Sequence, residues 1–193
     1  MARPDIKDQR REQILDAFSV CIARYGLDGA TLAKTAEVAG MARPLVRHNV
    51  GNRSDLLAAF VDRLLEKSAE GSAMLVSQLP LHNRSGTLID WLFDTQYSDK
   101  QNIQVSHALI VASADDPTLS EKMQVWIDNF IEMLKQVIRS DYPDASPKRI
   151  TAIATGISGI YFNVEALYPL QKAKALRTAS KRAARILLSS LED

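Results

Sequence analysis

The sequence predicts an all-α protein of nine helices, and three observations support this prediction. Hydrophobic residues make up 46% of the 193 positions, which is enough to form a buried core. Aromatic residues make up only 6%, and the alternating Val- and Thr-rich runs typical of strands are few. Apolar residues instead recur at helical spacing between glycine and proline breaks.

The first predicted helix runs from about Lys7 to Tyr25 and ends at Gly26. Its apolar side chains recur three or four residues apart, at Ile14, Phe18, Cys21, Ile22 and Tyr25. Because the chain has one cysteine, an internal disulfide is excluded, and we expect Cys21 to be a small buried side chain of a reduced, cytoplasmic protein. No signal peptide or membrane-spanning segment is expected, because no apolar run approaches about 18 residues.

Two short helices follow, joined by a tight turn. Thr31 is placed to cap the first, which extends to Ala39, and Gly40 permits the positive φ that the turn requires. The second covers about residues 42–49, with Pro44 in its first turn, where the missing N–H costs nothing. This layout predicts a helix-turn-helix, whose second helix enters the major groove of DNA.

A longer helix follows this pair and is expected to start at a Ser54 cap. Its apolar stripe consists of Leu57, Phe60, Val61, Leu64 and Leu65. Counting this long helix, six predicted helices follow the pair. They cover residues 54–79, 84–97, 100–114, 118–140, 147–168 and 171–191. Residues 1–53 carry nine Lys and Arg against six Asp and Glu, a basic excess that is weak evidence by itself.

The second short helix must pack by Leu45 or Val46 together with Val50, which leaves its other side chains facing outward. An outward arginine can contact guanine O6 and N7 with two hydrogen bonds, and a proline ring can pack on a thymine methyl. Thr31 and Arg53 are suited to phosphates, and Arg3, Lys7, Arg10 and Arg11 could add contacts from an N-terminal arm or remain a solvated tail. The predicted contacts with double-stranded DNA are Thr31, Arg43, Pro44, Leu45, Arg47, His48, Asn49 and Arg53.

At these residues the chain resembles the TetR family of bacterial transcription regulators. The resemblance rests on four segments within the first 65 residues: ILDAF at 14–18, YG at 25–26, TLAKTAEVAGM at 31–41 and VGNRSDLLAAFVDRL at 50–64. The chain departs from the family pattern at Ala42, Arg47, Asn49, Val50 and Arg53. Arginine in place of the usual tyrosine at position 47 should shift that contact towards phosphate or guanine.

The resemblance implies a DNA-binding head at residues 1–53 and a body at residues 54–193 that binds a small-molecule effector and forms a homodimer. It implies a repressor that the effector releases from a palindromic operator, with recognition helices about 34–36 Å apart. The expected ligand-binding residues are Trp91, Tyr97, His107, Met123, Trp126, Phe130 and Phe162, with Tyr161 beside them, and the alternative is that they are core. The expected dimer residues, for which packing within one chain is the alternative, are Ala152, Thr155, Gly156, Gly159, Ala179, Ala183 and Leu187.

The sequence offers little support for other classes of function. The three histidines lie far apart, Cys21 has no evident base partner, and no glycine-rich phosphate loop is present, so we expect no enzyme, no cofactor and no metal site. The remaining alternative is a helical adaptor that binds only protein. Such an adaptor would show no salt-dependent affinity for duplex DNA.

Overall fold

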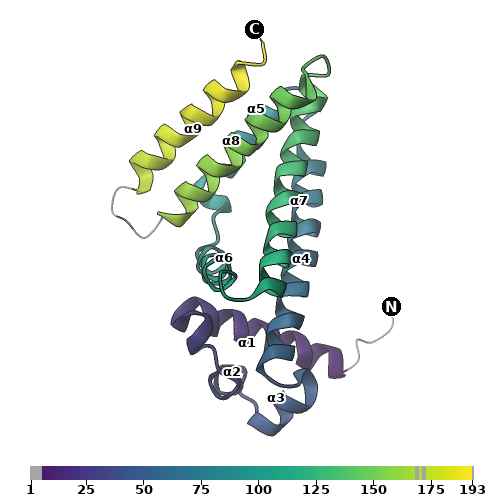
Figure 1. Cartoon of the computed structure of the whole chain (residues 1–193), viewed down its shortest axis with the longest axis vertical. Helices are drawn as coiled ribbons and strands as arrows, with labels where there is room; N and C mark the ends of the chain where they lie inside the picture. The colour runs from purple at the N-terminus through teal and green to yellow at the C-terminus, as the bar shows by residue number, and fades with distance from the viewer. Residues whose placement is uncertain (1–5, 168–169, 171–172, 193) are drawn as a thin grey trace. The chain divides into compact units, whose positions relative to one another are not determined.

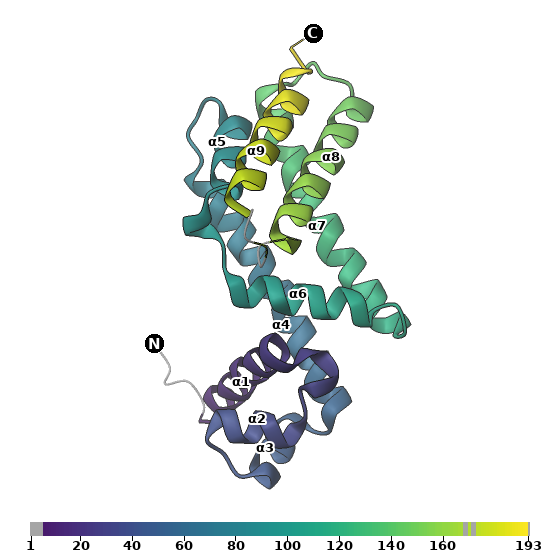
Figure 2. The ribbon, with the colours of Figure 1, turned by 90° about the vertical axis from the view of Figure 1, so that its left-hand side faces the viewer.

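The computed structural model confirms the all-α prediction (Figures 1 and 2). It describes residues 6–167, 170 and 173–192, in which nine α-helices, one 3₁₀ turn and no strand are found. None of the helices in these residues is long and apolar enough to cross a membrane. The elements are α1 (Ile6–Gly29), α2 (Leu32–Ala39), α3 (Arg43–Val50), α4 (Arg53–Gln78), α5 (Arg84–Leu92), η1 (Thr95–Tyr97), α6 (Lys100–Ala112), α7 (Pro117–Asp141), α8 (Pro147–Ala166) and α9 (Ala173–Ser189).

The chain forms two compact units, and α4 and α7 contribute to both. The first unit comprises residues 1–67 and 100–123, and the second comprises residues 68–99 and 124–193. The first unit therefore contains α1 to α3 with α6, whereas the second contains α5, η1, α8 and α9.

The core of the first unit forms around α1, on which α2, α3 and α6 all pack. Phe18 is fully buried and meets the ring of Phe60 edge to face, with centroids 5.5 Å apart. Gln101 of α6 donates a hydrogen bond to the Ser19 hydroxyl (2.9 Å). As expected, Cys21 is buried, and burial raises the pKa of its thiol, which makes it a packing side chain rather than a reactive one.

The first helix breaks at the predicted glycine but continues beyond it. Gly26 has φ 69° and ψ 174°, a conformation that only glycine adopts readily, and a last turn then runs to Gly29. The expectation that Tyr25 is a core residue is wrong, because 49% of the residue is exposed. Its ring instead packs against the ammonium group of Lys34, 4.0 Å from the ring centroid.

The cap of α4 is Asn52 rather than the predicted Ser54. The Asn52 side-chain oxygen accepts hydrogen bonds from the N–H groups of Ser54 (2.7 Å) and Asp55 (3.0 Å). The Asp55 carboxylate in return accepts the N–H of Asn52 (2.9 Å), which closes a reciprocal capping box. The helix therefore begins at Arg53, directly after Asn52, and Ser54 lies in its first turn.

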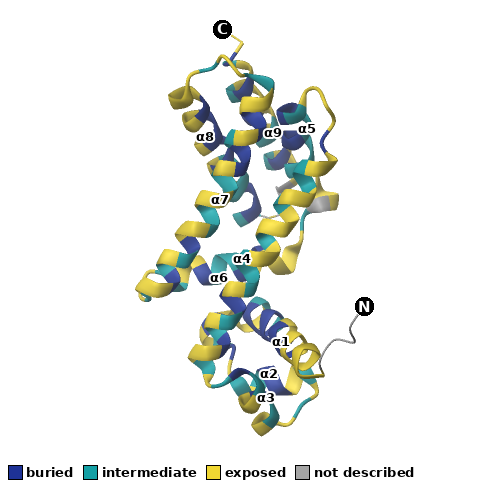
Figure 3. Cartoon of the chain, turned by 90° about the vertical axis from the view of Figure 1, so that its right-hand side faces the viewer, coloured by how far each residue is buried: buried dark blue, intermediate teal, exposed yellow. Residues whose placement is uncertain are grey.

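The second unit has its core between the C-terminal part of α4, α5, α7, α8 and α9. In Figure 3 the buried positions of α8 and α9 are dark blue and the exposed ones yellow. Asp90 of α5 pairs with Lys181 (2.8 Å) and Arg185 (2.6 Å) of α9. Burial acts to raise the pKa of Asp90, but hydrogen bonds from these two cations lower it overall. The fully buried core residues here are Leu88, Ile89, Leu134, Ile138, Ile150, Ala154, Ile157 and Ala184.

The single helix predicted over residues 84–97 is wrong, because α5 ends at Leu92. Asp94 starts a separate 3₁₀ turn by accepting a hydrogen bond from the N–H of Gln96 (3.0 Å). At the other end of α5, the Asp141 carboxylate accepts hydrogen bonds from the N–H and hydroxyl of Ser85 (2.7 and 2.5 Å). The predicted start of the last helix at residue 171 lies outside the described residues.

Candidate DNA-binding and ligand sites

The turn between α2 and α3 is set by local sequence. Thr31 caps α2 as predicted, because its hydroxyl oxygen accepts the N–H of Lys34 (3.3 Å). Gly40 ends α2 with φ 63° and ψ 31°, and the N–H of Met41 donates to the carbonyl of Ala36 (2.9 Å). This left-handed glycine with a wrapped-back N–H is a Schellman motif, which reverses the chain over two residues.

The short helix α3 has one buried face and one basic exposed face. Val46 is fully buried and Val50 nearly so, while Leu45 is half-buried, so Val46 is the main inward side chain of the two alternatives. The N-cap Ala42 makes no side-chain hydrogen bond, and a proline follows in the first turn. The side chains exposed on the outer face of α3 are Arg43, Pro44, Arg47 and His48.

Two further predicted DNA contacts already make hydrogen bonds within the first unit. Asn49 donates its side-chain amide to the carbonyl of Leu45 (2.8 Å), one turn earlier in α3. Arg53 donates from its guanidinium to the carbonyl of Leu27 (2.6 Å) and is half-buried. This hydrogen bond joins the start of α4 to the end of α1. A guanidinium has five N–H donors, so other donors of Arg53 remain available.

Three of the four residues predicted for an N-terminal arm lie on a helix instead. Lys7, Arg10 and Arg11 are exposed, but they lie on α1, which begins at Ile6. Arg3 lies outside the described residues.

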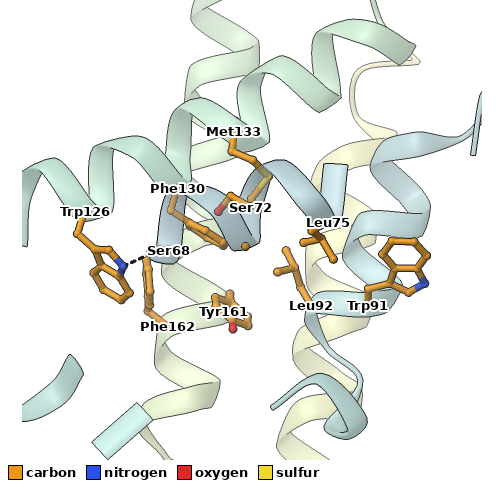
Figure 4. A pocket seen from close by; sticks show the side chains of 11 residues that line it. Ser68, Ser72, Leu75, Trp91, Leu92, Trp126, Phe130, Met133, Tyr161 and Phe162 are labelled. Carbon is orange, nitrogen blue, oxygen red and sulfur yellow. Dashed lines mark hydrogen bonds between the residues drawn. The ribbon is translucent and has the colours of Figure 1, made fainter. Parts of the chain in front are cut away.

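A pocket of about 360 Å³ lies in the second unit, lined by α4, α5, α7 and α8 (Figure 4). Figure 4 shows the rings of α7 and α8 on one side, with Leu75, Trp91 and Leu92 on the other. Of the residues predicted to bind a ligand, the pocket brings together Trp91, Trp126, Phe130 and Phe162, with Tyr161. The lining residues that the sequence analysis missed are Ser68, Gly71, Ser72, Leu75, Leu92 and Met133. For Ser68, Gly71 and Ser72 the signal was a series of small residues at helical spacing in α4, which leave room beside the aromatic rings.

The aromatic side of the pocket is a self-packed cluster. Phe130 stacks on Tyr161 with centroids 5.4 Å apart and also contacts Phe162 at 5.2 Å. Trp126 lies 5.3 Å from Phe162 and donates its indole N–H to the hydroxyl of Ser68 (3.0 Å). These contacts hold the rings in defined positions, so the wall of the pocket is preformed.

Three residues predicted for the ligand site are not shown in this pocket. Met123 is 2% exposed, and both it and His107 of α6 belong to the first unit, so they do not line it. The side chain of Tyr97 lies outside the described part of the structure. Met123 lies outside the pocket because the N-terminal turns of α7 pack in the first compact unit. Helical periodicity alone does not reveal this division of α7.

A buried ion pair joins α8 to α9 close to Tyr161. Glu165 and Arg177 are 2.6 Å apart, and their side chains are only 7% and 9% exposed. Ser98 donates a hydrogen bond to the other oxygen of Glu165 (2.9 Å), whereas the second terminal nitrogen of Arg177 has no hydrogen-bond partner among the described residues. Burial, reinforced by the negative charge of Glu165, raises the pKa of Tyr161 to about 12.

The residues predicted to form a dimer interface lie on neighbouring helices, α8 and α9 (Figure 1), but not all face outward. Gly156 faces Leu187 within the chain, because a Cβ at Gly156 would lie 3.1 Å from a Leu187 methyl carbon. Gly156 and Leu187 therefore pack on each other within the chain, as in the alternative to a dimer interface, and both stay half-buried. Ala183 is half-buried, and the exposed members of the set are Ala152, Thr155, Gly159 and Ala179.

Comparisons with known proteins agree with the helix-turn-helix. No family model matches the chain. It is 33% identical over 85 residues to the HTH-type transcriptional repressor AcnR of Corynebacterium jeikeium, covering 43% of this chain and 45% of that protein. It is 34% identical over 65 residues to the HTH-type transcriptional regulator BetI of Paraburkholderia phymatum, covering 34% of this chain and 33% of that protein. The chain thus matches less than half the length of these two relatives.

Solved structures match almost the whole chain. A transcriptional regulator from Pseudomonas aeruginosa has a TM-score of 0.79 at 17% identity, covering 96% of this chain and 91% of that one. A TetR transcription regulator from Haloarcula marismortui has a TM-score of 0.76 at 18% identity, covering 95% and 98%. The chain has the fold of TetR-family regulators, and the resemblance drawn from its first 65 residues is confirmed. The proteins that it resembles are transcription regulators, not enzymes.

Proposed function

We propose that the protein is a sequence-specific DNA-binding transcription regulator. The observation that carries the proposal is α3, whose inner face is anchored by Val46 while Arg43 and Arg47 stand exposed on its outer face. A helix of this kind fits the major groove, and exposed arginines supply both phosphate contacts and guanine recognition. Such a protein acts in the cytoplasm, where the bacterial chromosome lies.

We further propose the functional division into a head at residues 1–53 and a body at residues 54–193. In this proposal the body pairs two copies, so that the two heads bind a palindromic operator. A small molecule bound in the pocket of the body then favours a state of the dimer that fits the operator poorly, which releases repression. The pocket with its preformed aromatic wall supports the effector part of the proposal.

A gel-shift titration with the DNA upstream of the protein's own gene tests the function. We expect specific retardation at moderate salt, with an apparent affinity that falls steeply as salt concentration rises, because bound arginines release phosphate counterions. The control is DNA of equal length and shuffled sequence. Equal retardation of both DNAs would contradict sequence-specific binding, and no retardation of either by the folded protein would favour the protein-binding adaptor.

The homodimer can be tested at Gly159, which is exposed on α8 and has open space where a side chain would begin. We expect Gly159→Arg to convert a dimer to a monomer in size-exclusion chromatography with light scattering, because it places a charge in an apolar interface. The control is Ala69→Arg, at an exposed small residue of α4 that does not line the pocket. A Gly159→Arg protein that stays as dimeric as this control would contradict the proposed α8–α9 interface.

A further inference from the structure

The pocket of the second unit also has a distinct chemical character. No Asp, Glu, Lys, Arg or His is among its lining residues. Its polar groups are the hydroxyls of Ser68, Ser72 and Tyr161, beside the indole of Trp91 and that of Trp126. The nearby Glu165 and Arg177 are paired with each other and are not part of the lining.

This lining disfavours a charged ligand of either sign. Moving an ionised group out of water without a partner costs several kcal/mol, and the lining offers no countercharge. Aromatic rings can hold a cation over an open face. Here Phe130 and Tyr161 each turn one face to the other, and Phe162 packs between Phe130 and Trp126, which reduces the ring surface open to a cation. The high pKa of Tyr161, about 12, keeps its hydroxyl neutral at every physiological pH.

The hydroxyls in the lining can orient an uncharged ligand. Ser68 accepts the indole N–H of Trp126, so its own O–H remains a donor. The Ser72 hydroxyl makes no hydrogen bond with another described residue and also lines the pocket. An apolar cavity of roughly 150 Å³ holds one benzene molecule, so a cavity of about 360 Å³ has room for about two rings. Flat rings also fit a wall made of aromatic faces and edges.

We propose that this pocket binds an uncharged, planar molecule of about two aromatic rings that carries a hydroxyl or carbonyl oxygen facing Ser68 and Ser72. This inference rests on the proposed function in one respect, which is that the bound molecule is taken to be the effector. The pocket can be tested without DNA, so its failure is distinguishable from a failure of DNA binding.

The test is calorimetric titration of the full-length protein with three probes that share a naphthalene ring. They are 2-naphthol, which is neutral, 2-naphthoate, which is anionic, and a 2-naphthyl trimethylammonium salt, which is cationic. At pH 7 we expect 2-naphthol to bind at least ten-fold more tightly than either charged probe. A charged probe that binds as tightly as 2-naphthol, or no binding of 2-naphthol at millimolar concentration, would overturn the proposal.

A variant at Gly71 tests whether the binding lies in this pocket. Gly71 lines the pocket, and a Cβ built on it meets nothing within 4 Å, so there is open space where a leucine side chain would begin. We expect Gly71→Leu to weaken 2-naphthol binding at least ten-fold. The control is Glu70→Leu, at an exposed position of α4 outside the lining, which should leave the binding within about two-fold. Gly71→Leu should melt no lower than the parent, because glycine is unfavourable inside a helix. Unchanged binding in Gly71→Leu would place the 2-naphthol site elsewhere and contradict the proposal.

Discussion

The double variant Arg43→Ala/Arg47→Ala should lose about 30-fold to more than 10,000-fold of its operator affinity. A good arginine contact with a base contributes about 1–3 kcal/mol of discrimination, and two such contacts together correspond to this range. Both side chains are exposed on α3, whose packing rests on Val46 and Val50, so their removal leaves the core of the head intact. Fluorescence anisotropy with labelled operator and shuffled DNA, at one fixed salt concentration, measures the change.

Two single variants show whether the loss reports sequence recognition. Arg139→Ala removes an exposed arginine of α7, in the second unit, and should leave operator affinity within about two-fold. Arg53→Ala should weaken operator and shuffled DNA alike, as expected for a phosphate contact. Because Arg53 also donates a hydrogen bond to the carbonyl of Leu27, the melting temperature of the Arg53→Ala protein must be measured together with its DNA affinity. If the double variant loses equal affinity for both DNAs, the two arginines of α3 do not read bases.

Arg177→Met should cost about 3–5 kcal/mol of unfolding free energy, the expected effect of removing one member of a buried ion pair. The substitution leaves the carboxylate of Glu165 buried beside α9, where the Ser98 hydroxyl is its remaining partner among the described residues. Urea denaturation followed by circular dichroism measures the loss. Among the described residues, one buried terminal nitrogen of Arg177 has no hydrogen-bond partner, so these residues do not fully satisfy the pair in the native protein.

The double variant Glu165→Leu/Arg177→Met separates the charge effect from packing. Replacing both charges with apolar groups of similar size removes the uncompensated charge, so we expect most of the stability lost in Arg177→Met to return. The control is Lys181→Met, which removes a partly exposed cation of α9 that pairs with Asp90 and should cost less than about 1 kcal/mol. A double variant as unstable as Arg177→Met would show that the shape of the arginine, rather than the charge pair, stabilises this region.

The sequence by itself determined the helical class, the helix-turn-helix and the basic outer face of α3, because these depend on neighbours in the chain. Thr31 caps α2 and Gly40 adopts positive φ through contacts within a few residues, so the residue types alone predict them. Locally competing groups were harder to rank. Asn52 and Ser54 are both good caps, and only the structure shows that Asn52 and Asp55 bond reciprocally.

Only the tertiary structure decided which bulky side chains share a pocket and which are core. Trp126 and Met123 lie on one helix, three residues apart, yet Trp126 lines the pocket and Met123 is buried in the other compact unit. Helical spacing predicts which face of a helix is apolar, but it does not show which partner covers that face at each turn. The same reason explains Gly156, which packs on Leu187 of the same chain, and the Glu165–Arg177 pair, whose members are charged in sequence and buried in the fold.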